Sequence, residues 1–164
     1  MVIGSIMPLG SASMSRAEDQ QFFDLLAGSY RRLTGAEPPF LDPAKPTDAA
    51  WLYTQAPACV LAHDTAPDPR FIYANRSAQD LFEYSWDEFV ATPSRLSAEA
   101  PDRAERQRLL DAVARDGFAS GYAGIRIAKS GRRFMIDDGV LWQLRAEDGT
   151  LHGVAASFAR WRNL

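Results

Sequence analysis

The fold is decided by the stretch Phe71-Ile72-Tyr73-Ala74-Asn75-Arg76-Ser77-Ala78-Gln79-Asp80-Leu81-Phe82-Glu83-Tyr84-Ser85-Trp86-Asp87-Glu88-Phe89. Its first four residues form an apolar run with the length and composition of a strand. Asn75 follows, and asparagine favours a helix N-cap because its side chain accepts an N–H from the first turn. Ala78, Leu81 and Phe82 then recur at helical spacing, which predicts a helix with one buried face.

A second helix start follows at once. Ser85 and Glu88 form the Ser-x-x-Glu pattern of a capping box. Trp86 and Phe89 supply the apolar side of this short helix. A strand that leads into two short capped helices is a compact unit, and its apolar side chains need a sheet to cover.

This stretch resembles the opening of a PAS domain, and the longer run to Ser97 is similar to the MEKHLA family. That family is a PAS-related domain, found alone in bacteria and algae and at the C-terminus of class III homeodomain–leucine zipper plant transcription factors. The resemblance covers most of the chain, from about residue 50 to about residue 160. Since one fold hosts many functions, it implies a fold rather than a chemistry. The matching segments are Asn75-Arg76, Leu81-Phe82-Glu83-Tyr84-Ser85-Trp86, Pro93-Ser94-Arg95, Lys129-Ser130-Gly131-Arg132-Arg133-Phe134 and Trp142.

Composition indicates an ordinary soluble globular protein. The chain has 164 residues, of which 46% are hydrophobic and 24% charged. The net charge of −3 argues against nucleic-acid binding, for which a basic domain is expected. Cys59 is the only cysteine, so the chain has neither an intrachain disulfide nor a structural zinc site built on several thiolates. We therefore expect a cytoplasmic protein.

The N-terminal region predicts an extension to the domain. Met1–Leu9 is apolar but too short to span a membrane, and no basic residue precedes it, so we expect neither a membrane anchor nor a secretory signal. The capping box Ser15-Arg16-Ala17-Glu18 predicts an amphipathic helix over 16–33 that stops at Gly35. Residues 36–47 hold four prolines and predict a linker.

The predicted domains are therefore an extension at 1–47 and a PAS-like domain at 48–164. The apolar face of the predicted helix has two candidate partners. It packs on the outer face of the domain's own sheet, or it pairs with a second copy in a dimer. The residues of this face are Phe22, Leu25, Leu26 and Leu33, with Phe23 and Tyr30 beside them.

Strand patterns occur twice before the helices and three times after them. A helix over 102–115 separates the two groups, and Asp48 caps a further short helix at 49–55. Five strands in this arrangement match a PAS fold, which implies an α+β structure with an antiparallel sheet in order 2-1-5-4-3 and short helices on one face. If Ser130-Gly131 is a two-residue turn, Ile127 lies opposite Phe134.

Asp138 is the most unusual residue, because it shares the alternation of Phe134, Val140 and Trp142 on the predicted buried face. A buried carboxylate needs a partner, and Arg95 is a candidate. The alternative is a bulge over residues 137–139 that turns the acid out to solvent.

The arginines of residues 103–115 alternate with acids and predict a solvated helix face rather than an anion site. Arg126, Arg133 and Asp137 share one strand phase and predict an exposed cross-strand charge ladder.

The sequence identifies no cofactor. Flavin photoreceptors of the PAS class place a reactive cysteine in a segment that corresponds to residues 91–96, and this segment has no cysteine. Cys59 is expected to be a small buried apolar residue. His63 and His152 have no second feature that supports haem ligation, and adjacent His63 and Asp64 point to opposite faces of a strand.

Three functions are consistent with the sequence. The first is a sensory module that binds a small apolar or aromatic ligand and acts through a protein partner or a homodimer. The second is an interaction module whose core is filled by its own aromatic side chains. The third is a small enzyme that uses Asp138 and His63 as acid and base. The candidate pocket residues are His63, Tyr73, Leu81, Phe82, Trp86, Phe89, Arg95, Phe134, Asp138 and Trp142.

Overall fold

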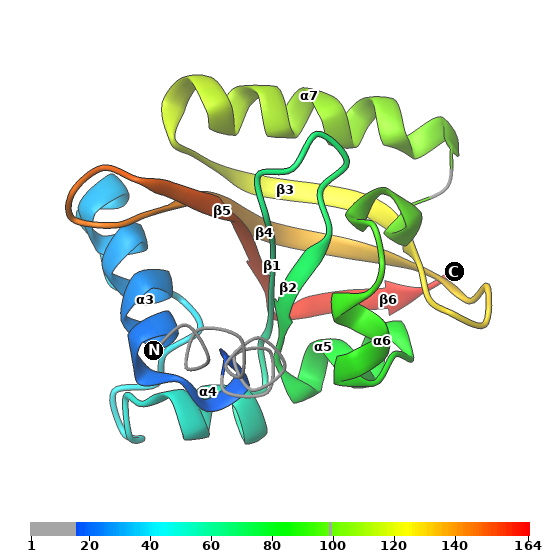
Figure 1. Cartoon of the computed structure of the whole chain (residues 1–164). Helices are drawn as coiled ribbons and strands as arrows, with labels where there is room; N and C mark the ends of the chain where they lie inside the picture. Colours follow the sequence, from blue (N-terminus) through cyan, green and yellow to red (C-terminus); the bar gives the residue numbers. More distant parts are fainter. Residues whose placement is uncertain (1–15, 99) are drawn as a thin grey trace, which may run out of the picture.

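One antiparallel sheet organises the chain (Figure 1). The computed structural model describes residues 16–98 and 100–164, with the backbone alone for 100–102. The strand order β2-β1-β5-β4-β3 confirms the predicted order and the α+β class. The strands are β1 (Cys59–His63), β2 (Phe71–Ala74), β3 (Phe118–Ile127), β4 (Arg133–Arg145) and β5 (Leu151–Phe158).

A sixth strand, β6 (Arg160–Asn163), is missing from the predicted five. It pairs with Phe134–Asp137 of β4, while β5 pairs with Val140–Arg145 of the same strand. All four residues of β6 are exposed, so the segment lacks the apolar alternation by which a half-buried strand is detected.

The helices that follow β2 begin at the predicted caps. The side chain of Asn75 accepts from Ala78 N at the start of α5 (Arg76–Phe82). Ser85 and Glu88 form both hydrogen bonds of the capping box of α6 (Trp86–Val90). The short helix η1 (Ser94–Ser97) leads to α7 (Ala100–Asp116), which contains the helix predicted over 102–115. These elements cover the inner face of the sheet, with α7 along β3 (Figure 1).

Helices α3 (Gln20–Thr34) and α4 (Ala49–Thr54) cover the outer face. Phe22 and Leu26 are buried, and the indole N–H of Trp142 in β4 donates to the Leu26 carbonyl at 3.1 Å. The apolar side of α3 thus packs on its own sheet, the first of the two predicted alternatives. Asp19, rather than a residue of the predicted capping box, caps α3. The cap residue of that box, Ser15, lies outside the described residues, and the domain boundary at residue 48 stays a prediction.

The β3–β4 hairpin has a different register from the predicted one. Arg126, not Ile127, lies opposite Phe134. Ala128 N bonds to Arg132 O, and Gly131 has φ +93°, so the loop has three residues and ends in a left-handed glycine. A slip of one residue moves every side chain to the other face. Arg126 is therefore buried, with an exposed fraction of 6%, and the predicted exposed ladder that included it is wrong.

Candidate functional site

A cavity of about 60 Å³ lies on the inner face of the sheet, partly open to solvent. Its wall is mainly apolar, and five side chains add polar atoms: His63, Ser97, Arg106, Tyr122 and Arg126. The apolar lining residues include Leu61, Phe71, Phe82, Leu109, Ile136 and Phe158. The wall thus combines three parts of the chain: the sheet, the end of α5, and the segment from η1 to α7.

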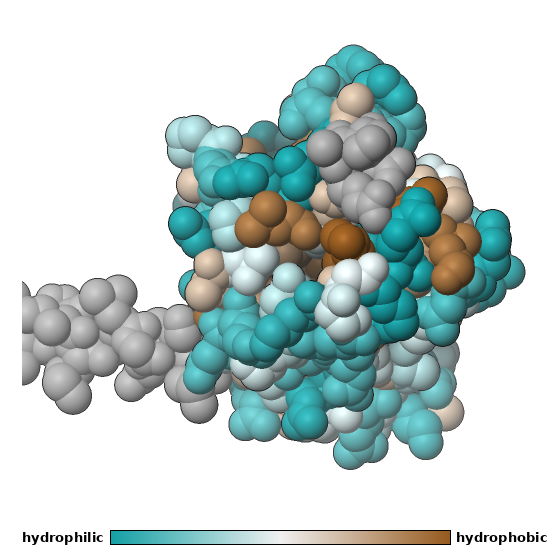
Figure 2. Space-filling view, turned by 90° about the vertical axis from the view of Figure 1, so that its right-hand side faces the viewer, coloured by the Kyte–Doolittle hydropathy of each residue, from teal (hydrophilic) through white to brown (hydrophobic). Residues whose placement is uncertain are grey.

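Apolar side chains also reach the surface on this side of the molecule. Figure 2 views the side on which α7 begins and shows them gathered in a hollow beneath this helix, within a mainly hydrophilic face. Leu109 and Leu110 of α7 line the cavity and are only partly buried. The cavity therefore adjoins a helix that covers it incompletely.

Two predicted pocket residues, His63 and Phe82, line this cavity. Leu81, Phe89 and Phe134 belong to the same inner core but pack beside the cavity. The ring centroid of Phe82 lies 5.5 Å from that of Phe89 and 5.1 Å from that of Phe134. These rings pack against one another beneath α5 and α6, and the cavity lies beneath α7.

Tyr73, Trp86 and Trp142 belong to the outer core beneath α3 and α4, so they do not line the cavity. Strand irregularities explain two of the three. The register shifts between Ala62 and His63, so Phe71 and Tyr73 face opposite sides despite their spacing of two. In β4, Asp138 has a left-handed backbone conformation that interrupts the alternation of side chains. Ile136 therefore lies on the inner face of the sheet and Trp142 on the outer face.

Asp138 is exposed and has φ +55°, in accordance with the predicted bulge. Its carboxylate bonds to Arg160 at 3.4 Å. Arg95 is also exposed and pairs with Asp68 at 3.1 Å. The predicted pairing of Asp138 with Arg95 is therefore wrong, and neither residue lines the inner cavity. His63 does line it, so the structure does not bring together the acid and base of the enzyme hypothesis.

His63 presents an open acceptor at the cavity. Its Nδ1 lies 2.8 Å from the Asp64 carbonyl, which only accepts, so Nδ1 donates. The other nitrogen, Nε2, then has a lone pair, and it is buried with no hydrogen-bond partner. Burial lowers the pKa of His63 below its ordinary value of 6.5, and the positive charge of Arg106 lowers it further. The ring is therefore neutral near pH 7.

Arg106 turns toward the cavity rather than to solvent, contrary to the predicted solvated face. Its guanidinium donates to the Ser94 hydroxyl, and no acid among the described residues pairs with it. Helical spacing contains the signal for this placement. Arg106 precedes Leu109, Leu110 and Val113 by three, four and seven residues, so it belongs to the buried side of α7.

Arg126 reaches the cavity wall through the hairpin register. Its guanidinium lies 5.0 Å from the centroid of the Tyr122 ring, and Nη1 donates to the Ile125 carbonyl at 2.7 Å. Both contacts hold the side chain against β3. From the sequence, only the true length of the turn that follows β3 reveals that Arg126 faces inward.

Other chemistries find less support in the described part of the chain. Cys59 is fully buried in β1, and burial raises the pKa of its thiol to about 12, so no reactive thiolate forms near neutral pH. Among the described residues, no group of three His, Cys, Asp or Glu side chains is placed to hold a metal ion. No helix in the same residues is long and apolar enough to cross a membrane.

Comparison with known proteins identifies related sequences and folds. The family model for the MEKHLA domain matches residues 20–163. A search of curated proteins found no match. The structure is similar to the PAS domain of a protein from Colwellia psychrerythraea, with a TM-score of 0.58 and 16% identity over 70% of this chain and 92% of that one.

Two light-oxygen-voltage (LOV) proteins have the same fold. The dark structure of the blue-light photoreceptor Aureochrome1 LOV gives a TM-score of 0.51 and 18% identity, over 65% of this chain and 73% of that one. An RNA-binding light-oxygen-voltage receptor gives a TM-score of 0.56 and 23% identity, over 75% of this chain and 35% of that one. At these identities the likeness concerns the fold alone.

Proposed function

The chain belongs to the MEKHLA domain family, and from that premise we propose that it is a PAS-like regulatory module that binds a small ligand in the inner cavity and acts through a protein partner. The cavity is the observation that supports this function. It combines an apolar wall with a few convergent polar groups, the usual composition of a small-molecule site.

Binding would be transmitted through α7, because this helix borders the cavity and is held weakly. Among its residues with described side chains, only Val113 is fully buried. A ligand that contacts Leu109 and Leu110 stabilises the docked helix and shifts its population. A protein partner, or a second copy of the chain, then recognises the docked helix. We place this activity in the cytoplasm, where a chain with the single cysteine Cys59 needs no disulfide.

Flavin photochemistry does not fit this cavity. One solved structure with a similar fold comes from a study of a flavin analogue and the mechanism of a light-oxygen-voltage domain. A cavity of about 150 Å³ accommodates benzene, whereas this one measures about 60 Å³ and is too small for the three fused rings of a flavin. Its lining includes no cysteine for adduct formation. The proposed ligand is therefore a smaller molecule.

A ligand-free interaction module is the second candidate, and the same volume favours it. Drug-sized ligands occupy pockets of roughly 300–1,000 Å³, several times the space found here. The aromatic rings of Phe82, Phe89 and Phe134 fill the region beneath α5 and α6. In this alternative the inner core serves stability, and the module acts only through its surface.

A neutral apolar probe distinguishes the two functions. Butan-1-ol is titrated into ¹⁵N-labelled protein, and the backbone amide shifts of the residues around the cavity are followed. The proposed function predicts saturable shifts that Ala156→Leu abolishes, since Ala156 lines the cavity and the added side chain fills it. Ala104→Leu is the matched control, because Ala104 is exposed on α7. Unsaturable shifts in the wild-type protein would instead support the filled core.

A further inference from the structure

Arg106 is a cation that pairs with no acid among the side chains that the structure describes. Its guanidinium stays protonated at every pH at which the protein is folded. Burial lowers its pKa. Its hydrogen-bond partner is the neutral Ser94 hydroxyl. Arg106 is partly buried. A charge that loses part of its water without a counter-ion is destabilised, so an anion that enters the cavity is stabilised there.

His63 supplies the complementary group. Its buried Nε2 can accept a hydrogen bond and has no donor. The residue lines the same cavity as Arg106, and the positive charge of Arg106 acts on its ring. The cavity wall therefore combines a cation that pairs with no described acid and a neutral acceptor that has no donor, beside the apolar side chains of Leu61, Phe82 and Ile136.

We propose that the ligand of this cavity is a short hydroxy acid, whose carboxylate pairs with Arg106 and whose hydroxyl donates to Nε2 of His63. A carboxylate alone satisfies Arg106 but faces the lone pair of His63, and an alcohol alone leaves Arg106 unpaired. The cavity measures about 60 Å³ and is partly open to solvent, which limits the part of the ligand inside it to a few carbon atoms. This assignment rests on the proposed function and specifies its ligand class.

Three probes of similar size test the assignment by NMR titration of the full chain. They are 3-hydroxybutanoate, butanoate and butane-1,3-diol. A hydrogen bond to a charged group contributes enough binding free energy to change the affinity of a ligand by at least about tenfold. We expect 3-hydroxybutanoate to bind at least about tenfold more tightly than the diol and more tightly than butanoate.

The variant Arg106→Gln removes the charge while keeping a long polar side chain that suits a helix. We expect this variant to bind 3-hydroxybutanoate at least about tenfold more weakly than the wild-type protein does. Its affinity for the diol should be unchanged. Arg108→Gln is the matched control, because Arg108 is exposed on the same helix and pairs with Glu105. We expect this control to bind like the wild-type protein, and its amide spectrum verifies that α7 still folds.

The outcomes separate the ligand class from the function. The role of Arg106 would be overturned if Arg106→Gln and Arg108→Gln lost the same affinity for 3-hydroxybutanoate. It would also be overturned if the wild-type protein bound 3-hydroxybutanoate and the diol equally well. Equal binding of butanoate and 3-hydroxybutanoate would overturn the role of His63. If no probe binds while butan-1-ol does, the hydroxy-acid assignment fails and the proposed function stands. If butan-1-ol also fails to bind, both are overturned.

Discussion

Asn75 connects three elements through one fully buried side chain. Its Oδ1 accepts from Val60 N at 3.0 Å and from Ala78 N at 3.2 Å. Its Nδ2 donates to the Leu52 carbonyl at 3.2 Å and the Ala58 carbonyl at 2.9 Å. The residue predicted as a local helix cap thus also holds β1 and the end of α4, because an amide has donors as well as acceptors.

The variant Asn75→Asp tests this network while preserving shape. It replaces both donated hydrogen bonds with a carboxylate oxygen that faces two carbonyls. We expect a loss of at least about 3 kcal/mol of unfolding free energy, because buried polar groups lose their partners. Ser85→Ala removes an exposed cap and should cost only about 1 kcal/mol. Urea denaturation measures both variants, and equal losses would show that Asn75 is merely a helix cap.

His63 makes stability depend on pH. Its folded-state pKa lies below the ordinary value of 6.5, because burial disfavours the charged ring. As pH falls below 6.5, the unfolded chain binds a proton at this site before the folded protein does. Its contribution to stability is therefore present above pH 6.5 and decreases as pH falls toward the folded-state pKa.

We expect His63→Gln to flatten the decline of unfolding free energy below pH 6.5. His152→Gln, which removes a histidine at an exposed position of β5, is the control for the substitution itself. Denaturant melts at several pH values between 5 and 8 provide the comparison. The same slope for wild type and His63→Gln would contradict the buried, neutral ring. Asp64 and Arg106 also act on His63, so their charges are kept unchanged in both variants.

At the scale of elements, the sequence predicts helix starts better than strand faces. A cap depends on residues within one turn, so Asp48, Asn75 and Ser85 could each be identified from local chemistry. A strand face depends on counting by two, and a single extra residue reverses it. The bulge at Asp138 and the three-residue turn at Gly131 are such cases, which explains why Trp142 and Arg126 face sides other than those predicted.

An element that buries more side chains should also resist local unfolding more strongly. Helix α7 buries few side chains, whereas β4 has six consecutive buried residues from Gly139 to Leu144. Backbone amides exchange with deuterium when the structure opens locally. We expect the free energy of this opening to be much lower in the middle of α7 than in β4. Hydrogen exchange followed by NMR measures both. Equal protection in the two elements would contradict the role given to α7 as the part that responds to ligand.

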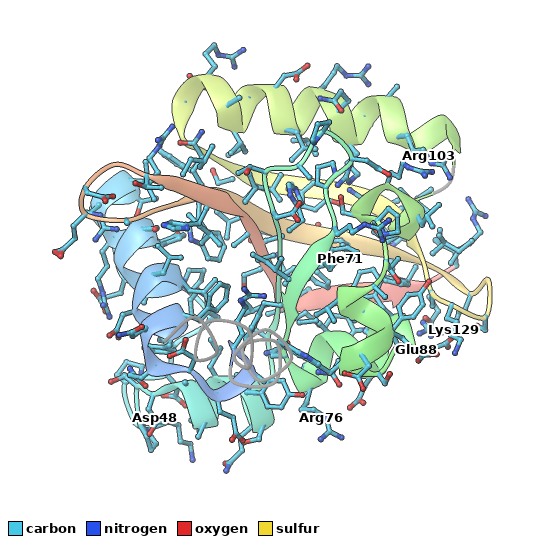
Figure 3. All side chains as sticks on the ribbon, in the orientation of Figure 1. Asp48, Phe71, Arg76, Glu88, Arg103 and Lys129 are labelled. Carbon is cyan, nitrogen blue, oxygen red and sulfur yellow. The ribbon has the colours of Figure 1, made fainter. Side chains whose placement is uncertain are left out.

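On the scale of the whole molecule, the sheet separates an outer face packed against α3 and α4 from an inner face with the cavity that we propose as the binding site. The outer face packs Trp142 against α3, with the Phe40 ring stacked on its indole at 5.8 Å between centroids. The inner face holds the cavity. Surface pairs join its parts, such as that between Glu88 of α6 and Lys129 of the hairpin (Figure 3). Sequence patterns alone predicted the layers but not where the inner face leaves space, since that depends on how completely the aromatic rings fill it.

The native mass spectrum of the freshly purified protein, compared with its denatured mass, tests most directly whether this domain holds a ligand. We expect a reproducible excess mass that is lost on denaturation and is absent from Ala156→Leu, in which the cavity is filled. The control Ala104→Leu should retain the excess. A wild-type protein at its bare mass, together with no saturable binding of butan-1-ol, would contradict the account and assign the inner face to a filled core.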